Sequence, residues 1–159
     1  MSEQPPSRSV RPSVVLGMCT VGFFAVVVAG LGFASLLTDA DVIAVRGLGQ
    51  GPGVVGIAIA CATFAIAVWS AIRRPPGSFR SVPVVVAATY LAYVLATGVA
   101  AAVVSSDLGA GLAVTGELAT GWQGGVVAAA ALLAGIAGVA LARMSAARPR
   151  WPWERDDED

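Results

Sequence analysis

Histidine and lysine are both absent from the 159-residue sequence, and only two cysteines occur. Histidine is the commonest metal ligand and general base, so its absence removes most metal sites and acid–base mechanisms. A serine nucleophile would need another base, and none stands near the apolar segments. The sequence therefore predicts no catalytic residue, no metal site, no cofactor and no enzymatic activity.

The two cysteines, Cys19 and Cys61, are too few for a disulfide framework or a zinc site. They also do not form the Cys-x-x-Cys pair that quinone-linked thiol oxidoreductases of membranes require. We predict that both are small apolar packing residues.

Charged side chains are scarce, at 13% of residues against 57% apolar residues. A soluble domain carries about twice that share of charge, so this chain lacks the charged coat that water requires. The composition predicts an integral protein of the lipid bilayer, and with a formal net charge of zero no nucleic-acid partner is expected.

Four stretches contain no charged residue, and each is about 25 residues long: Pro12 to Thr38, Gly47 to Ile72, Ser81 to Ser106 and Leu118 to Ala142. About 20 residues cross a hydrocarbon core as a helix, and a single apolar segment can satisfy its backbone there only as a helix. We predict an all-α, four-helix transmembrane bundle with short loops. The expected helices are 13–37, 53–72, 83–105 and 120–142, within a transmembrane domain of residues 13–142.

The arginines indicate the orientation of this bundle. Nine of the ten lie before the first predicted helix, between the second and third, or after the fourth; only Arg46 lies on the other side. The positive-inside rule makes the arginine-rich side cytoplasmic. We therefore expect a multi-pass protein of the bacterial plasma membrane, with a cytoplasmic N-terminal segment (1–12) and a disordered cytoplasmic tail (143–159).

Ionisable residues inside a span often mark transport or proton relay, and the central parts of the predicted helices contain none. Small multidrug transporters resemble this chain in length and helix number, but they need a glutamate in the first helix, and 13–37 has no carboxylate. Glu117, at the outer start of the fourth predicted helix, comes closest. We interpret it as a solvated interfacial residue beside Arg46; the alternative is a coupling-ion site.

A polar stripe follows one side of the third predicted helix. Thr89, Tyr93 and Thr97 are spaced i, i+4, i+8 on one face, and Tyr90 stands beside them. One interpretation is hydrogen bonding between helices or back to the preceding turn. The other is the wall of a small-molecule pocket.

Small residues recur four positions apart, as in Gly98/Ala102 and Ala134/Gly138. Such pairs let helix backbones approach closely. They predict a tightly packed bundle and leave a homo-oligomer or another membrane-protein partner open.

The C-terminal tail combines Arg148, Arg150, Trp151 and Trp153 with a run of acidic residues. One interpretation is a membrane-surface anchor, with arginines at anionic headgroups and an acidic end in water. The alternative is a short motif that docks a cytoplasmic protein, with the tryptophans as anchors.

Gly51-Pro-Gly-Val-Val-Gly56 matches the G-x-G-x-x-G pattern of dinucleotide-binding proteins. That site needs a strand before the glycines and an acidic residue about 20 positions later. Here a predicted membrane helix follows, and it ends at Arg73 and Arg74. We therefore interpret the glycines as a turn into that helix, with Pro52 in its first turn.

The arginine-rich N-terminus, the outer segment Asp41-Val-Ile-Ala-Val-Arg-Gly-Leu-Gly-Gln50 and the tryptophan-containing tail together resemble uncharacterised four-span membrane proteins of actinobacteria. The resemblance covers most of the chain and implies no activity or site residue. The sequence favours a non-enzymatic accessory or scaffold subunit acting through bundle packing and the tail. The alternative is a small transporter or channel component with the polar face on the third helix.

Overall fold

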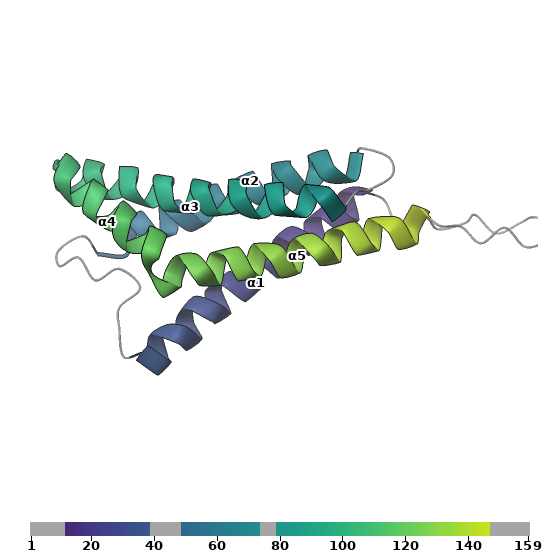
Figure 1. The fold of residues 1–159 in the computed structure, drawn as a ribbon, viewed down its shortest axis with the longest axis horizontal. Helices are drawn as coiled ribbons and strands as arrows, with labels where there is room; N and C mark the ends of the chain where they lie inside the picture. The colour runs from purple at the N-terminus through teal and green to yellow at the C-terminus, as the bar shows by residue number, and fades with distance from the viewer. Residues whose placement is uncertain (1–11, 39–48, 74–78, 147–159) are drawn as a thin grey trace, which may run out of the picture.

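The computed structural model describes residues 12–38, 49–73 and 79–146, and every element in these ranges is a helix. They form, in chain order, α1 (Pro12–Thr38), α2 (Gly51–Arg73), the 3₁₀ helix η1 (Phe79–Ser81), α3 (Val82–Ser105), α4 (Leu108–Thr120) and α5 (Trp122–Ala146) (Figure 1). The all-α prediction is confirmed for these residues. The N-terminal segment up to residue 11 and residues 147–159 of the predicted tail lie outside them. Residues 143–146, which we predicted as the start of a disordered tail, are instead the last residues of α5.

Four of the described helices are long and apolar. They contain 27 residues in α1, 23 in α2, 24 in α3 and 25 in α5, or roughly 35–40 Å at 1.5 Å per residue. By length and composition each can cross a membrane, whose hydrocarbon core is about 30 Å thick. The four helices therefore indicate a multi-pass membrane protein.

The outer surface of the bundle is apolar. Leu36 of α1 is 83% exposed, Ile66 of α2 71% and Val103 of α3 73%. Contiguous apolar surface of this kind is unfavourable in water, whereas lipid acyl chains solvate it. The placement of these side chains agrees with the apolar composition of the helices.

The segment between α3 and α5, which we expected to be a short loop, forms α4. The backbone turns at Ser106, where φ is +54°, and the Asp107 carboxylate then accepts a hydrogen bond from Gly109 N at 2.8 Å as the N-cap of α4. With 13 residues, α4 is too short to cross a membrane. Because α4 ends at Thr120, Glu117 lies in its last turn and not at the start of the final span.

Packing against α3 explains why α4 is a helix. Gly98 of α3 and Gly111 of α4 face each other so closely that a Cβ atom on Gly111 would lie 2.8 Å from Gly98 O. This contact needs glycine on both helices. In Figure 1 the turn between α3 and α4 projects beyond the ends of the other helices.

α3 is the central helix of the fold, because it packs against α2, α4 and α5. Figure 1 shows α2 antiparallel to α3, and α1 crossing α5 obliquely. At the middle of the bundle the rings of Phe23 (α1) and Phe64 (α2) stack with centroids 4.4 Å apart, and both side chains are fully buried. The core thus joins all four long helices.

Candidate functional site

Three members of the predicted polar stripe are completely buried. Thr89, Tyr93 and Thr97 of α3 each have an exposed fraction of 0%, whereas Tyr90 is half-buried. The helical spacing that put the first three on one face is preserved. That face is covered by the same chain.

The C-terminal part of this face packs against the start of α2. A Cβ atom on Gly56 would overlap the Thr97 hydroxyl and would lie 3.4 Å from Tyr93 Cδ2. The Thr97 hydroxyl donates to Tyr93 O at 2.8 Å, one turn earlier in α3. Gly56 is the last glycine of the G-x-G-x-x-G pattern, and it serves here as a helix contact.

The nucleotide-like pattern itself lies within α2. Residues 51–56 form its first turns, and Pro52 is buried as the second residue of the helix. The expected turn is consequently shorter than predicted, with Gly49 at a φ of +61° just before the helix. Val42–Val45 and Arg46 lie outside the described residues.

Two hydroxyls of the stripe are buried without a hydrogen-bond partner in the described part of the chain: Thr89 Oγ1 and Tyr93 OH. A buried polar group without a partner costs about 1–3 kcal/mol. Most native structures contain few such groups, and each calls for a physical explanation. These two hydroxyls are the clearest polar irregularity of the described bundle.

Tyr90 belongs to a different place. Its hydroxyl donates to Ala119 O of α4 at 2.8 Å. Its ring lies against the start of α5, where a Cβ atom on Gly124 would be 2.9 Å from Tyr90 Cε2. Tyr90 therefore ties α3 to the α4–α5 junction, and the four stripe residues do not form one site.

On the N-terminal side of Tyr90 along α3, an apolar groove of about 460 Å³ lies between α3 and α5. Its lining residues are Pro83, Val86, Ala87 and Tyr90 of α3 with Ala128 and Leu132 of α5. Pro83, Ala87 and Leu132 are exposed, so this α3–α5 groove opens on the outer surface of the bundle. The sequence analysis missed it, because nothing in the spacing of these common apolar residues shows where two helices part.

The remaining predicted residues have structural surroundings. Cys19 and Cys61 are free thiols; Cys19 is buried, and its sulfur would lie 3.2 Å from a Cβ atom on Gly138 of α5. Arg73, in the last turn of α2, places its guanidinium 4.4 Å from the ring centre of Trp69. A cation held over an aromatic face is favourable and suits the end of a membrane helix.

Within residues 12–38, 49–73 and 79–146, no three His, Cys, Asp or Glu side chains lie close enough to hold a metal ion. Glu117 is half-buried in the last turn of α4. The tail residues Arg148, Arg150, Trp151 and Trp153 are outside the described ranges.

Comparison with curated proteins and with solved structures gave no match. The model of a family of unknown function, DUF6121, matches residues 7–159, which is nearly the whole chain. The family description names no activity, substrate or partner. The chain therefore belongs to DUF6121, a family of unknown function.

Proposed function

We propose that this protein is a non-enzymatic accessory or scaffold subunit in the plasma membrane of a bacterium, with both termini in the cytoplasm. The arginine asymmetry supports the orientation. The arginine-only set of basic residues and the content of Ala, Val and Gly favour an actinobacterial source. A C-terminal alkaline phosphatase fusion should be inactive and a C-terminal fluorescent protein bright; an active phosphatase would contradict the orientation.

The burial of the polar stripe carries this proposal. A substrate path through a single chain would need polar side chains facing an open cavity, but Thr89, Tyr93 and Thr97 are each 0% exposed. The open surface of the described helices is mostly apolar, and it suits contact with lipid or with other membrane helices. Association is therefore better supported than transport through one chain.

The tail is the part that we assign to a cytoplasmic partner. Arg148, Arg150, Trp151 and Trp153 combine charge with large aromatic anchors, the residue types that dominate many interfaces. Deletion of residues 148–159 should abolish recovery of partner proteins in a pull-down from crosslinked membranes. A control variant with the same tail composition in scrambled order separates a specific motif from a simple surface anchor. Recovery of the same partners after deletion would contradict the docking role.

A second function has one observation in its favour. Thr89 Oγ1 and Tyr93 OH lack hydrogen-bond partners among the described residues, so a rearranged or oligomeric state could present them to a substrate. A transporter or channel component would then show flux in proteoliposomes that Thr89→Val and Tyr93→Phe reduce. Absence of flux for the wild-type chain, with partner recovery that depends on the tail, favours the scaffold.

A further inference from the structure

We propose that α4 is a re-entrant membrane helix, which enters the bilayer at the α3–α4 turn and contacts acyl chains of that leaflet through Leu108 and Leu112. The proposal depends neither on the scaffold function nor on which side of the membrane this leaflet faces. It rests on the surface chemistry of α4, on the contact that fixes its depth beside α3, and on the apolar surface that the two helices share.

The exposed side of α4 carries no charge. Leu108 and Leu112 lie one turn apart on this side, and they are 79% and 73% exposed. The opposite side packs into the bundle through Gly111, Val114 and Leu118. A helix at a water surface turns charged or polar side chains away from the core, whereas a helix that is apolar on both sides belongs in a protein core or in lipid. The exposed side of α4 therefore suits contact with lipid.

The contact between α4 and α3 fixes the depth of α4. Gly111 faces Gly98, and a Cβ atom on Gly98 would overlap the Thr115 hydroxyl. Gly98 precedes Ser105, the last residue of α3, by seven residues, which is about 10 Å along the helix axis. α3 is roughly 36 Å long and exceeds a hydrocarbon core of about 30 Å by only about 6 Å. When α3 spans that core, Gly98 and the α4 residues beside it lie several Å below the core surface.

The apolar surface of α3 continues without interruption as far as the α3–α4 turn. Four side chains spaced four residues apart form one row along α3, and each is more than half exposed: Leu91, Leu95, Val99 and Val103. The next position in this row is Asp107, the N-cap of α4. No member of the row marks the end of the lipid environment before the turn. The exposed leucines of α4 extend the same surface, so lipid is the occupant that fits both helices.

Polar groups gather at the turn itself. Ser105, Ser106 and Asp107 are all exposed. The Asp107 carboxylate accepts a hydrogen bond from Gly109 N at 2.8 Å, and a negative charge at the start of a helix is favourable in contact with water. These three residues suit the membrane surface, and they separate the apolar row of α3 from the apolar side of α4.

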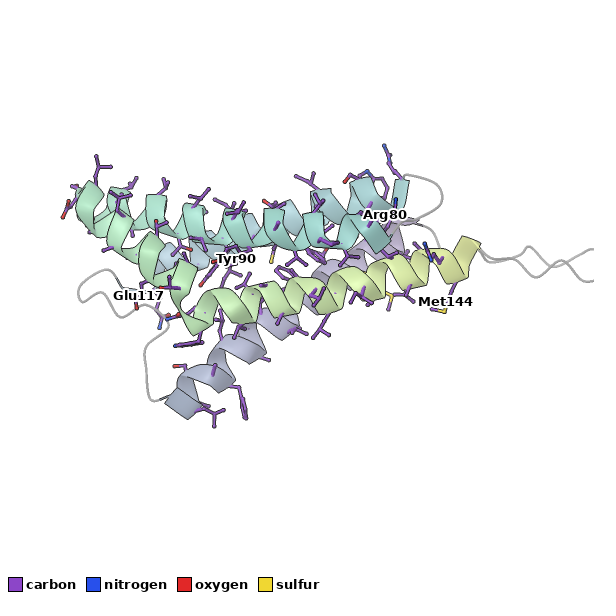
Figure 2. All side chains as sticks on the ribbon, in the orientation of Figure 1. Arg80, Tyr90, Glu117 and Met144 are labelled. Carbon is purple, nitrogen blue, oxygen red and sulfur yellow. The ribbon has the colours of Figure 1, made fainter. Side chains whose placement is uncertain are left out.

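Glu117 is the one ionisable residue within α4. It is half-buried, and it follows Leu112 by five residues, which turns it about 140° around the helix from the lipid-facing side. Figure 2 shows Glu117 and Arg80 toward opposite ends of the bundle, with Tyr90 between them. Ionisable residues inside a bilayer face protein and not lipid. The position of Glu117 on α4 therefore agrees with a helix that has one side in lipid.

The test measures the depth of spin labels in the full chain reconstituted into phosphatidylcholine vesicles. Cys19→Ala and Cys61→Ala remove the native thiols, and a label is then attached through Leu112→Cys, Leu95→Cys or Ser106→Cys. A label in lipid collides more often with oxygen than with a water-soluble nickel complex. The Leu112 label should show this preference as strongly as the Leu95 label on α3, and the Ser106 label should show the reverse.

Two results of this measurement would overturn the proposal. A Leu112 label that behaves like the Ser106 label would place α4 in water above the bilayer. A Leu112 label shielded from both reagents would assign this side of α4 to a protein partner or to a second copy of the chain.

A pair of variants with the native cysteines tests the same placement without a label. Leu112→Asp should lower the yield of folded protein in membranes severalfold, because a carboxylate facing lipid is costly. Ser106→Asp is the matched control in the polar turn and should leave the yield unchanged, since aspartate tolerates the left-handed backbone of that residue. Equal yields from the two variants would contradict the contact of Leu112 with lipid.

Discussion

The two flanks of α3 are packed in opposite ways. Toward α2, a single hydrogen atom at Gly56 is all that fits beside Thr97 and Tyr93. Toward α5, the wall formed by Pro83, Val86 and Ala87 stays open to the surface. The same helix thus makes one contact in which glycine is required and one in which side-chain volume is missing.

The difference follows from which residues stand opposite each other. On the closed flank, two buried hydroxyl-bearing side chains of α3 meet glycine. On the open flank, a Cβ atom on Gly135 of α5 would lie 3.6 Å from Val82 Cγ1 and 4.0 Å from Val85 Cγ1, which is ordinary van der Waals contact, and the exposed Ala87 near them leaves a gap. Helix association in lipid depends on close van der Waals packing. We infer that the α2–α3 contact contributes more to the stability of the bundle than the open flank does.

The largest effect on stability is expected from Gly56→Leu, which disturbs the tightly packed α2–α3 contact. The new side chain would have to displace Thr97 and Tyr93, and overpacking of this kind costs about 1–3 kcal/mol. The free energy of unfolding, measured by SDS titration in mixed micelles, should fall by that amount or more. Gly125→Leu is the control, because a Cβ atom at Gly125 meets nothing within 4 Å. Equal losses in the two variants would contradict a tight α2–α3 contact.

The sequence was sufficient to predict the four long helices, because an uncharged run in lipid must satisfy its own backbone. It was not sufficient for α4. Leu108–Thr120 is too short to span, and its three glycines lower its intrinsic helix propensity. What makes it helical is its fit against Gly98 of α3 together with the Asp107 cap, and the first of these depends on tertiary structure.

The candidate site residues also divide into those whose positions follow from helical spacing and those whose positions depend on tertiary structure. Spacing alone places Thr89, Tyr93 and Thr97 on one face, and all three are buried together. Tyr90 is only one residue away from Thr89, but its long ring reaches the α4–α5 junction, whose position depends on the unforeseen helix. The α3–α5 groove has no sequence pattern either, because it arises from the paths of two helices.

Tyr93→Phe and Tyr90→Phe, tested separately, compare the same two flanks of α3, and the expected changes in the free energy of unfolding are smaller. Tyr93→Phe deletes a buried hydroxyl that has no hydrogen-bond partner in the described structure, so it should stabilise the protein by roughly 1 kcal/mol. Tyr90→Phe deletes the bond to Ala119 O and should destabilise it by about 0.5–1 kcal/mol. The same SDS titration measures both. A loss of stability in Tyr93→Phe would mean that its hydroxyl is hydrogen-bonded in the membrane, as a ligand or water site requires.

The smallest effect is expected on the open flank itself. Leu132 is 45% exposed along the groove, so Leu132→Ala should change the free energy of unfolding by no more than about 0.5 kcal/mol. Leu95→Ala is the matched control, since Leu95 of α3 is 56% exposed and does not line the groove. A cost well above that of Leu95→Ala in lipid-free detergent would mean that α3 and α5 close on each other in solution.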